Sequence, residues 1–145
     1  MQAMVDAGTG YPKPLPTLND ENREFWEACR GGVLKLQKCR QCSHVRYPIN
    51  RFCPRCLSDE FEWAAMSGRA TVFSYIVFHQ SYHPGFKQDI PYNVALVQLE
   101  EGPRMFSNIV GTPNDQVKIG DAVQVMFDAV TPDITIPRFE LRKEA

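Results

Sequence analysis

The stretch from residue 39 to residue 56 reads CRQCSHVRYPINRFCPRC. It holds two Cys-x-x-Cys pairs, Cys39 with Cys42 and Cys53 with Cys56, and ten residues separate the pairs. Each pair can form a tight turn that points two sulfurs at one spot, and the connection is long enough for a short ribbon to fold back. Four converging thiolates form the tetrahedral, soft-ligand site that Zn²⁺ prefers. The spacing therefore predicts one Zn²⁺ per chain, held by these four cysteines.

Disulfide bonds and iron are the two alternatives to zinc. The first residues show no basic start followed by an apolar run, and no later segment reaches the length of a membrane span, so we expect a cytoplasmic chain with reduced thiols. Rubredoxin-type iron uses the same four-thiolate geometry, and spacing does not separate the two metals. Structural zinc is favoured because a redox iron site needs partners that the sequence does not reveal. Such a zinc site has no open position and is a staple, not a catalyst.

Two neighbouring residues are left out of the ligand set. Cys29 lies at helical spacing from Phe25, which indicates a small, buried, apolar side chain. His44 follows the first pair of cysteines, but four thiolates already complete a tetrahedron, so we interpret it as a surface residue.

Charge is balanced over the chain and unbalanced around the cysteines. The formal net charge is −1, which gives no global attraction to nucleic acid or membrane. No acidic residue lies between Glu27 and Asp59, whereas seven basic residues do: Arg30, Lys35, Lys38, Arg40, Arg46, Arg51 and Arg55. These cations can offset the charge of a zinc–thiolate centre, or they can form a docking face for phosphates or an acidic partner. Both interpretations stay open.

The chain divides into three predicted units. Residues 1–32 form a proline-rich arm, with Pro12, Pro14 and Pro16 alternating, and an amphipathic helix. The helix is expected to begin near Thr17 or Asn19 and to end at Gly31-Gly32. Residues 33–66 form the zinc ribbon, with strands expected at 33–38, at 44–47 and around 61–63. Residues 67–145 form a barrel.

The last unit is predicted to be all β. Segments rich in β-branched and aromatic residues recur between turn-like separators, and the expected strands are 71–78, 93–99, 105–110, 122–127 and 134–139. Five short strands are too few for an immunoglobulin sandwich and suit a small closed barrel. The fold class is therefore mainly β: an N-terminal helix, a four-cysteine zinc ribbon and a five-stranded OB-fold barrel.

No catalytic constellation is visible. The chain has no Gly-x-Ser-x-Gly, no phosphate-binding glycine loop and no zincin helix, so we expect no catalytic residue in it. His79 and His83 flank Tyr82 in the loop after the first barrel strand, and they are interpreted as polar loop residues.

Helix, four-cysteine ribbon and OB barrel, in this order, resemble a known family. The chain is similar to OB-fold proteins with a rubredoxin-like zinc ribbon, known as domain of unknown function family 35 and described as acyl-CoA-associated. The resemblance covers residues 19–141 and rests on the two cysteine pairs, Phe25-Trp26, Trp63, Gly68, Pro91 and Ile119-Gly120-Asp121. Ser43 and Leu57 depart from the family pattern, because glycine usually follows each knuckle there.

The resemblance implies a partner enzyme. Members of the family act beside thiolase-fold enzymes in hetero-oligomers, such as acyltransferases of secondary metabolism that make or break carbon–carbon bonds on ketone, polyketide-like or acyl-CoA substrates. Steroid side-chain aldolases have similar small partners. In such complexes the catalytic residues belong to the large subunits, so the chain is expected to be a non-catalytic accessory subunit.

Two rivals to this function come from other classes. One is a nucleic-acid-binding module, since OB barrels and zinc ribbons also serve that role; the balanced charge speaks against it. The other is a protein that binds acyl-CoA by itself, through the arginines of the ribbon.

Surplus apolar residues suggest where a partner docks. Phe25 and Trp26 lie on the predicted helix, while Phe52 and Leu57 lie beside the cysteines of a ribbon that has little interior. The helix either caps its own domain or buries its aromatic residues against another subunit. We predict that these four residues contact the partner, because exposed apolar clusters rimmed by arginine are typical of hot spots.

Overall fold

The N-terminal arm leads into one short helix. The computed structural model describes residues 11–142; the predicted start of the arm, residues 1–10, and the last residues of the barrel unit, 143–145, lie outside that range. Helix α1 (Arg23–Arg30) begins later than predicted. The side chain of Asn19 accepts hydrogen bonds from the N–H groups of Glu21 and Asn22, both at 2.9 Å, and so holds the preceding residues in a turn. None of the described helices is long and apolar enough to cross a membrane.

The helix ends where the two glycines predict. The N–H of Val33 donates to the carbonyl of Ala28 at 2.9 Å, and the N–H of Gly32 donates to that of Cys29 at 3.0 Å. Gly32 has φ +83°, the left-handed conformation that this C-terminal motif requires. The chain then turns directly into the ribbon.

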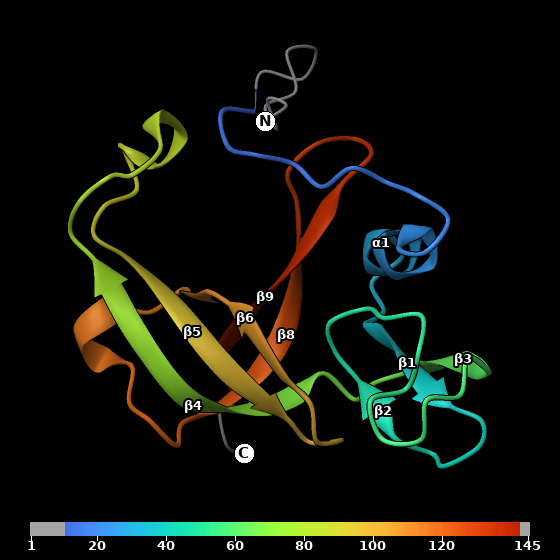
Figure 1. Cartoon of the computed structure of the whole chain (residues 1–145). Helices are drawn as coiled ribbons and strands as arrows, with labels where there is room; N and C mark the ends of the chain where they lie inside the picture. The colour runs from blue at the N-terminus through green and yellow to red at the C-terminus, as the bar shows by residue number, and fades with distance from the viewer. Residues whose placement is uncertain (1–10, 143–145) are drawn as a thin grey trace.

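The ribbon is a three-stranded antiparallel sheet. Its strands are β1 (Lys35–Cys39), β2 (Val45–Arg46) and β3 (Phe61–Ala65), in the order β2-β1-β3. Strand β1 lies in the middle and delivers Cys39 to the first turn. The short β2 returns beside it, and β3 leads the chain away to the barrel (Figure 1).

The barrel follows OB topology. A six-stranded sheet has the order β6-β5-β4-β8-β9-β7, and its members are β4 (Arg69–Phe78), β5 (Tyr92–Leu99), β6 (Arg104–Ser107), β7 (Ile109–Val110), β8 (Ala122–Ala129) and β9 (Thr135–Leu141). Short 3₁₀ turns lie at η1 (Pro84–Phe86) and η2 (Asn114–Gln116). Because β6 pairs with β5 and the adjoining β7 pairs in parallel with β9, the sheet closes on itself. The predicted mainly β class, with helix, ribbon and OB-fold barrel, is confirmed.

One predicted strand is broken. The segment 105–110 forms two strands separated at Asn108. The buried side chain of Asn93 takes the place of a backbone neighbour there: its amide donates to the carbonyl of Ile109 at 2.8 Å, and its oxygen accepts from the N–H of Ile109 at 2.7 Å. The break was not predictable from the pattern of apolar residues, because it depends on hydrogen bonds from one side chain to the backbone of a distant strand.

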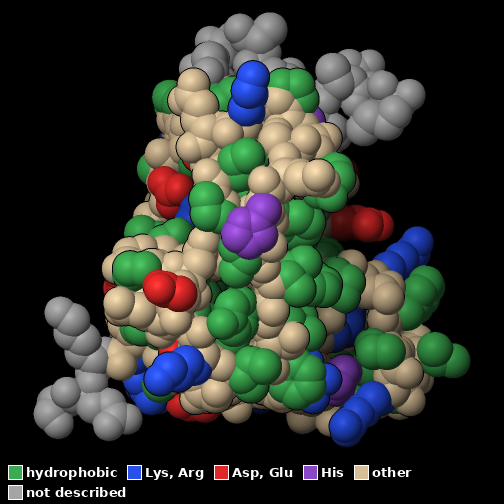
Figure 2. Space-filling model, turned by 90° about the vertical axis from the view of Figure 1, so that its left-hand side faces the viewer, with side chains coloured by type: hydrophobic (Ala, Val, Ile, Leu, Met, Phe, Trp, Pro, Cys, Tyr) green, Lys and Arg blue, Asp and Glu red, His purple; other side chains and the backbone are tan. Residues whose placement is uncertain are grey.

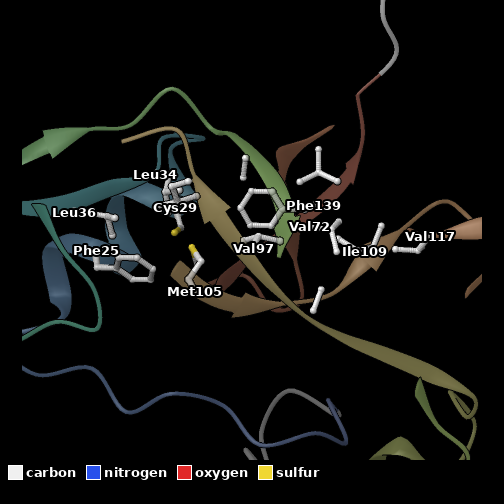
Figure 3. Close-up of a cluster of buried hydrophobic side chains, with 14 residues drawn as sticks. Phe25, Cys29, Leu34, Leu36, Val72, Val97, Met105, Ile109, Val117 and Phe139 are labelled. Atoms are coloured by element: carbon white, nitrogen blue, oxygen red, sulfur yellow. The ribbon is translucent and has the colours of Figure 1, made fainter. Parts of the chain in front are cut away.

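The helix, ribbon and barrel share one core. Phe25 and Cys29 of α1 and Leu34 and Leu36 of the ribbon segment are buried with barrel side chains such as Phe139 (Figure 3). Helix α1 therefore caps its own chain through Phe25 and Cys29, while Trp26 stays partly exposed. The prediction that Phe25 contacts a partner does not fit this structure, because only 3% of Phe25 is exposed.

Candidate metal centre

The four predicted ligands come together in one cluster. The sulfurs of Cys39, Cys42, Cys53 and Cys56 all lie within 4.8 Å of one another. Cys39 Sγ is 3.5 Å from Cys56 Sγ, and Cys42 Sγ is 3.6 Å from Cys53 Sγ. A regular tetrahedron with Zn–S bonds of about 2.3 Å has sulfur–sulfur edges of about 3.8 Å. The cluster is therefore of the right size for one tetrahedral zinc ion, and its donors are the right kind.

Two equivalent turns position the sulfurs. In the first, the N–H of Ser43 donates to the carbonyl of Cys39 at 3.0 Å; in the second, the N–H of Leu57 donates to the carbonyl of Cys53 at 2.8 Å. Each first cysteine also donates its own N–H across the turn, Cys39 to His44 at 2.8 Å and Cys53 to Ser58 at 2.9 Å. This repeated geometry makes each Cys-x-x-Cys pair a knuckle that aims both sulfurs at one point.

Both knuckles end in a left-handed residue that is not glycine. Ser43 has φ +67° and Leu57 has φ +66°. The resemblance noted from the sequence implies glycine at these two positions, so the backbone strain expected for residues with a Cβ is present. Leu57 is also 75% exposed, so within the described chain its side chain gains little burial in return for that strain.

Backbone N–H groups favour thiolate at two of the ligands. Hydrogen bonding from the N–H of Cys42 lowers the pKa of the Cys39 thiol to about 6. Burial alone would raise the pKa of Cys53, but the N–H groups of Cys56 and Arg55 outweigh it and lower that pKa. The N–H of Arg55 lies 3.4 Å from Cys53 Sγ, as such a bond requires. The knuckles are therefore built to hold anionic sulfur.

The last sulfur shows why a cation is needed. The N–H of Ser58 favours the Cys56 thiolate, but burial and the three neighbouring sulfurs outweigh it and raise the pKa of the Cys56 thiol to about 12. Four thiols this close cannot all ionise unless a positive ion neutralises them. A divalent cation supplies that charge, and the donor set suits Zn²⁺.

Cys29 and His44 lie outside the metal centre. Cys29 is buried in the shared core, and burial raises the pKa of its thiol to about 12, so it is a neutral packing group. For His44, partial burial and the nearby Arg55 and Arg46 lower the pKa of the imidazole. Neither residue belongs to the described ligand cluster.

The basic residues of the ribbon split into two groups. Arg46 is buried; its Nε donates to the carbonyl of Asn50 at 2.9 Å, and its guanidinium lies 5.0 Å from the ring centre of Phe61. It therefore holds the loop between the knuckles in place. Arg40, Arg51 and Arg55 are exposed around the knuckles and keep the ribbon surface positive.

The predicted partner-binding residues differ in exposure. Phe52 is 47% exposed and Leu57 is 75% exposed, so the knuckles carry accessible apolar side chains as expected. Trp26 is partly buried and packs edge-on against Phe25, with ring centres 5.0 Å apart. Whether Trp26, Phe52 and Leu57 contact a partner stays a prediction.

A second apolar surface was not predicted from the sequence. Strands β4, β5 and β6 carry Ile76, Val94, Leu96 and Phe106 on the outer face of the barrel, since Ile76 pairs with Val94 and Leu96 pairs with Phe106. Ile76 is 56% exposed and Phe106 is 69% exposed. Figure 2 shows the side of the barrel with the β4–β5 hairpin, where hydrophobic side chains are prominent and most charged ones lie toward the margins. We call Ile76, Val94, Leu96 and Phe106 the outer barrel face.

The fold and the metal centre define a protein that joins a four-cysteine zinc ribbon to an OB-fold barrel. Two family models match consecutive parts of the chain: the rubredoxin-like zinc ribbon domain of ChsH2 over residues 26–62, and the C-terminal OB-fold domain of ChsH2 over residues 63–128. The chain belongs to this family, the ChsH2 or DUF35 family.

Similar proteins cover the chain to different extents. The chain is 36% identical to a chain of the solved Ltp2–ChsH2(DUF35) aldolase, with a TM-score of 0.79, over 88% of this chain and 98% of that one. It is 29% identical to the benzoylsuccinyl-CoA thiolase subunit BbsA of Thauera aromatica, over 82% of each. It is 37% identical over 127 residues to a Thermomonospora curvata protein described as a probable enoyl-CoA hydratase alpha subunit. That match covers 88% of this chain but only 39% of the relative, so the chain spans about two fifths of that protein's length.

Proposed function

We propose that the chain is a non-catalytic, zinc-binding accessory subunit that binds thiolase-fold enzymes and holds their subunits together. The observation that carries this proposal is the likeness to the DUF35 chain of an aldolase complex, which extends over 98% of that chain. The likeness to a thiolase subunit over 82% of both chains supports it independently. In this role the zinc ion is structural: it stabilises the fold of the ribbon, which has little apolar interior of its own, and so fixes the shape of the ribbon surface.

The absence of a readable catalytic set fits this role. The Nδ1 atom of His83 accepts a hydrogen bond from the N–H of Gly85 at 2.9 Å, and its ring packs edge-on against Phe86. His83 is thereby used in forming a turn. His79 is an exposed loop residue. We propose that the nucleophile and the acid–base groups of the reaction belong to the partner.

A finer form of the proposal names the reaction. One candidate is an acyltransferase that makes or breaks a carbon–carbon bond on a ketone, polyketide-like or acyl-CoA substrate; in size and plan the chain resembles the small subunit of the monoacetylphloroglucinol acetyltransferase complex. A second candidate is the small partner of a steroid side-chain aldolase. The 36% identity to a chain of an aldolase complex supports the second candidate. Identifying the substrate of the partner enzyme would distinguish the two candidates.

The test is to purify the native complex from cells through a tag on this chain and to identify its partners by mass spectrometry. The proposal expects a thiolase-fold protein in stoichiometric amount that co-elutes in size-exclusion chromatography with the purified chain. It also expects no acyl-transfer turnover by the chain alone. Turnover by the isolated chain, or a failure of the recovered thiolase-fold protein to co-elute, would overturn it.

The rival nucleic-acid function makes a different prediction. If the exposed arginines of the ribbon served nucleic acid, single strands would bind to the purified chain, and affinity would fall steeply with added salt. We expect no such binding at either of two salt concentrations.

A further inference from the structure

A pocket of about 510 Å³ lies at the end of the barrel, beneath the N-terminal arm. Its walls come from the arm, from the loop between β4 and β5, and from β7 and β9; lining residues include Tyr11, Phe86, Tyr92, Val110, Ile136 and Arg138. We propose that this pocket binds a small, apolar ring compound that carries a carbonyl or carboxylate oxygen. The proposal concerns the isolated chain and does not depend on the identity of any partner.

The arm is fixed in place as one wall of the pocket. Lys13 Nζ pairs with Asp89 Oδ2 at 2.7 Å and lies 5.4 Å from the ring centre of Phe86. Gly85 allows the backbone to come close, because a Cβ atom there would lie 2.4 Å from the carbonyl oxygen of Pro12. The arm is therefore anchored on the β4–β5 loop by an ion pair, a cation–ring contact and close backbone packing.

The apolar part of the pocket has an ordered aromatic side. Phe86 and Tyr92 are stacked, with ring centres 5.1 Å apart, and Tyr92 is stacked in the same way on Phe78. Such a column gives a rigid aromatic wall against which an apolar ring can pack. Val110 and Ile136 complete the apolar lining.

The polar part centres on Arg138. Its Nε donates to Asp128 Oδ2 at 2.7 Å, and its Nη1 donates to Asn108 Oδ1 at 2.6 Å. Within residues 11–142, Nη2 makes no hydrogen bond. The guanidinium is thus held on two sides, and one nitrogen with two N–H groups is free to bind an acceptor.

The charges decide the class of ligand. Arg138 is already paired with Asp128, and Lys13 with Asp89, so the pocket offers no surplus charge for a polyanion such as a pyrophosphate. Asn93 donates to Asn114 at 3.0 Å, so these two amides of the lining are engaged with each other, and Arg138 keeps N–H groups for an acceptor. A volume of about 510 Å³ falls within the range of about 300–1,000 Å³ typical of small-molecule sites. One acceptor oxygen on an apolar ring matches these features.

The test is a titration of the zinc-loaded chain followed by amide NMR shifts. Three probes share a ring but differ in the acceptor: acetophenone, benzoate and ethylbenzene. We expect saturable shifts at residues that line the pocket, and binding of the two oxygen-bearing probes tighter than that of ethylbenzene by about tenfold, as a hydrogen bond to a charged donor implies. The difference between acetophenone and benzoate shows whether a negative charge adds affinity.

Three variants make the result specific. Arg138→Gln should reduce the affinity for acetophenone and benzoate to that for ethylbenzene and leave ethylbenzene unchanged. Val110→Phe should fill the pocket and abolish binding of all three probes. Ile119→Phe, on an exposed turn that does not line the pocket, should change nothing. Shifts that do not saturate, shifts elsewhere, or binding retained by Val110→Phe would overturn the proposal. If Arg138→Gln does not fold, equal affinity of all three probes for the natural chain would also overturn it.

Discussion

Ser43 and Leu57 occupy equivalent left-handed positions, one at the end of each knuckle. A left-handed conformation costs a residue with a Cβ about 1–2 kcal/mol, while a glycine lowers the free energy of unfolding by about 0.4–1 kcal/mol, because it increases the conformational entropy of the unfolded chain. We therefore expect Ser43→Gly and Leu57→Gly each to raise the free energy of unfolding of the zinc-loaded chain by about 0.5 kcal/mol. Denaturant titration measures this. Ser43→Ala, which keeps the Cβ, is the control and should give no gain; a loss of stability in both glycine variants would contradict the strain.

Cys29 should behave differently from the four ligands. Its pKa is raised to about 12 by burial, so at pH 8 the folded chain keeps it as an unreactive thiol. We expect an alkylating reagent to modify the four ligand cysteines after chelation and Cys29 only on unfolding, as counted by mass spectrometry.

Because the folded pKa of Cys29 lies above the ordinary value of 9.0, the stability from burying this thiol is complete below pH 9 and is lost as pH rises toward 12. Cys29→Ala should lessen that alkaline loss; rapid alkylation of Cys29 in the folded chain would contradict its burial.

At the scale of elements, the knuckles were predictable because their information is local. Cys-x-x-Cys spacing, a short return and a repeated turn define them within residues 39–58. Four of the five expected barrel strands were also predictable, since β-branched and aromatic runs between turns mark them, whereas the segment 105–110 is divided at Asn108. The position of Gly31-Gly32 likewise marked the end of α1, as the C-terminal hydrogen bonds show.

Other features depended on contacts between elements. Phe25 and Trp26 are neighbours on one helix, yet Phe25 enters the shared core and Trp26 stays partly outside it. The apolar stripe of the helix, taken from the sequence alone, does not show whether it packs against the same chain or against another subunit. The pocket beneath the arm joins residues far apart in the sequence, such as Lys13, Asp89 and Arg138, and so has no local signal.

Removing the metal should affect the ribbon first. The knuckles have few buried side chains besides the cysteines, whereas Leu34 and Leu36 pack into the shared core. We expect the purified chain to contain one zinc per chain, and chelation or Cys39→Ser to remove hydrogen-exchange protection around β2 and both knuckles while β4 and β5 keep theirs. Iron in place of zinc, or full protection of the knuckles after chelation, would contradict this. Ser67→Ala, away from the metal, is a suitable control.

At the scale of the whole molecule, two exposed apolar surfaces are candidates for the site that binds the partner. One consists of Phe52 and Leu57 on the knuckles, and the other is the outer barrel face. Figure 1 shows the tip of the β4–β5 hairpin far from the ribbon, whereas Phe106 lines a hollow together with Trp26 and Tyr47, so the outer barrel face extends toward the helix and ribbon. A subunit that holds other subunits together needs more than one contact region, so both surfaces fit the proposed function.

Leu57 distinguishes docking from mere exposure. Its side chain is 75% exposed and sits on a strained backbone, so the isolated chain would be more stable with glycine there. A residue that lowers the stability of the free chain is explained if its side chain is buried in the complex. We therefore expect Leu57→Gly to stabilise the free chain and yet weaken assembly with the thiolase-fold partner by about 2 kcal/mol, the size of a hot-spot loss.

Binding measurements on matched variants complete this test. Ser43→Gly relieves the same strain without removing an apolar side chain, so it should stabilise the chain and leave assembly unchanged. Phe52→Ala should weaken assembly about as much as Leu57→Gly, with zinc content retained, because both exposed side chains flank the second knuckle. If assembly is unaffected by Leu57→Gly with Phe52→Ala, but is lost in Ile76→Ser with Phe106→Ser, then the outer barrel face, and not the knuckles, is the surface that binds the partner.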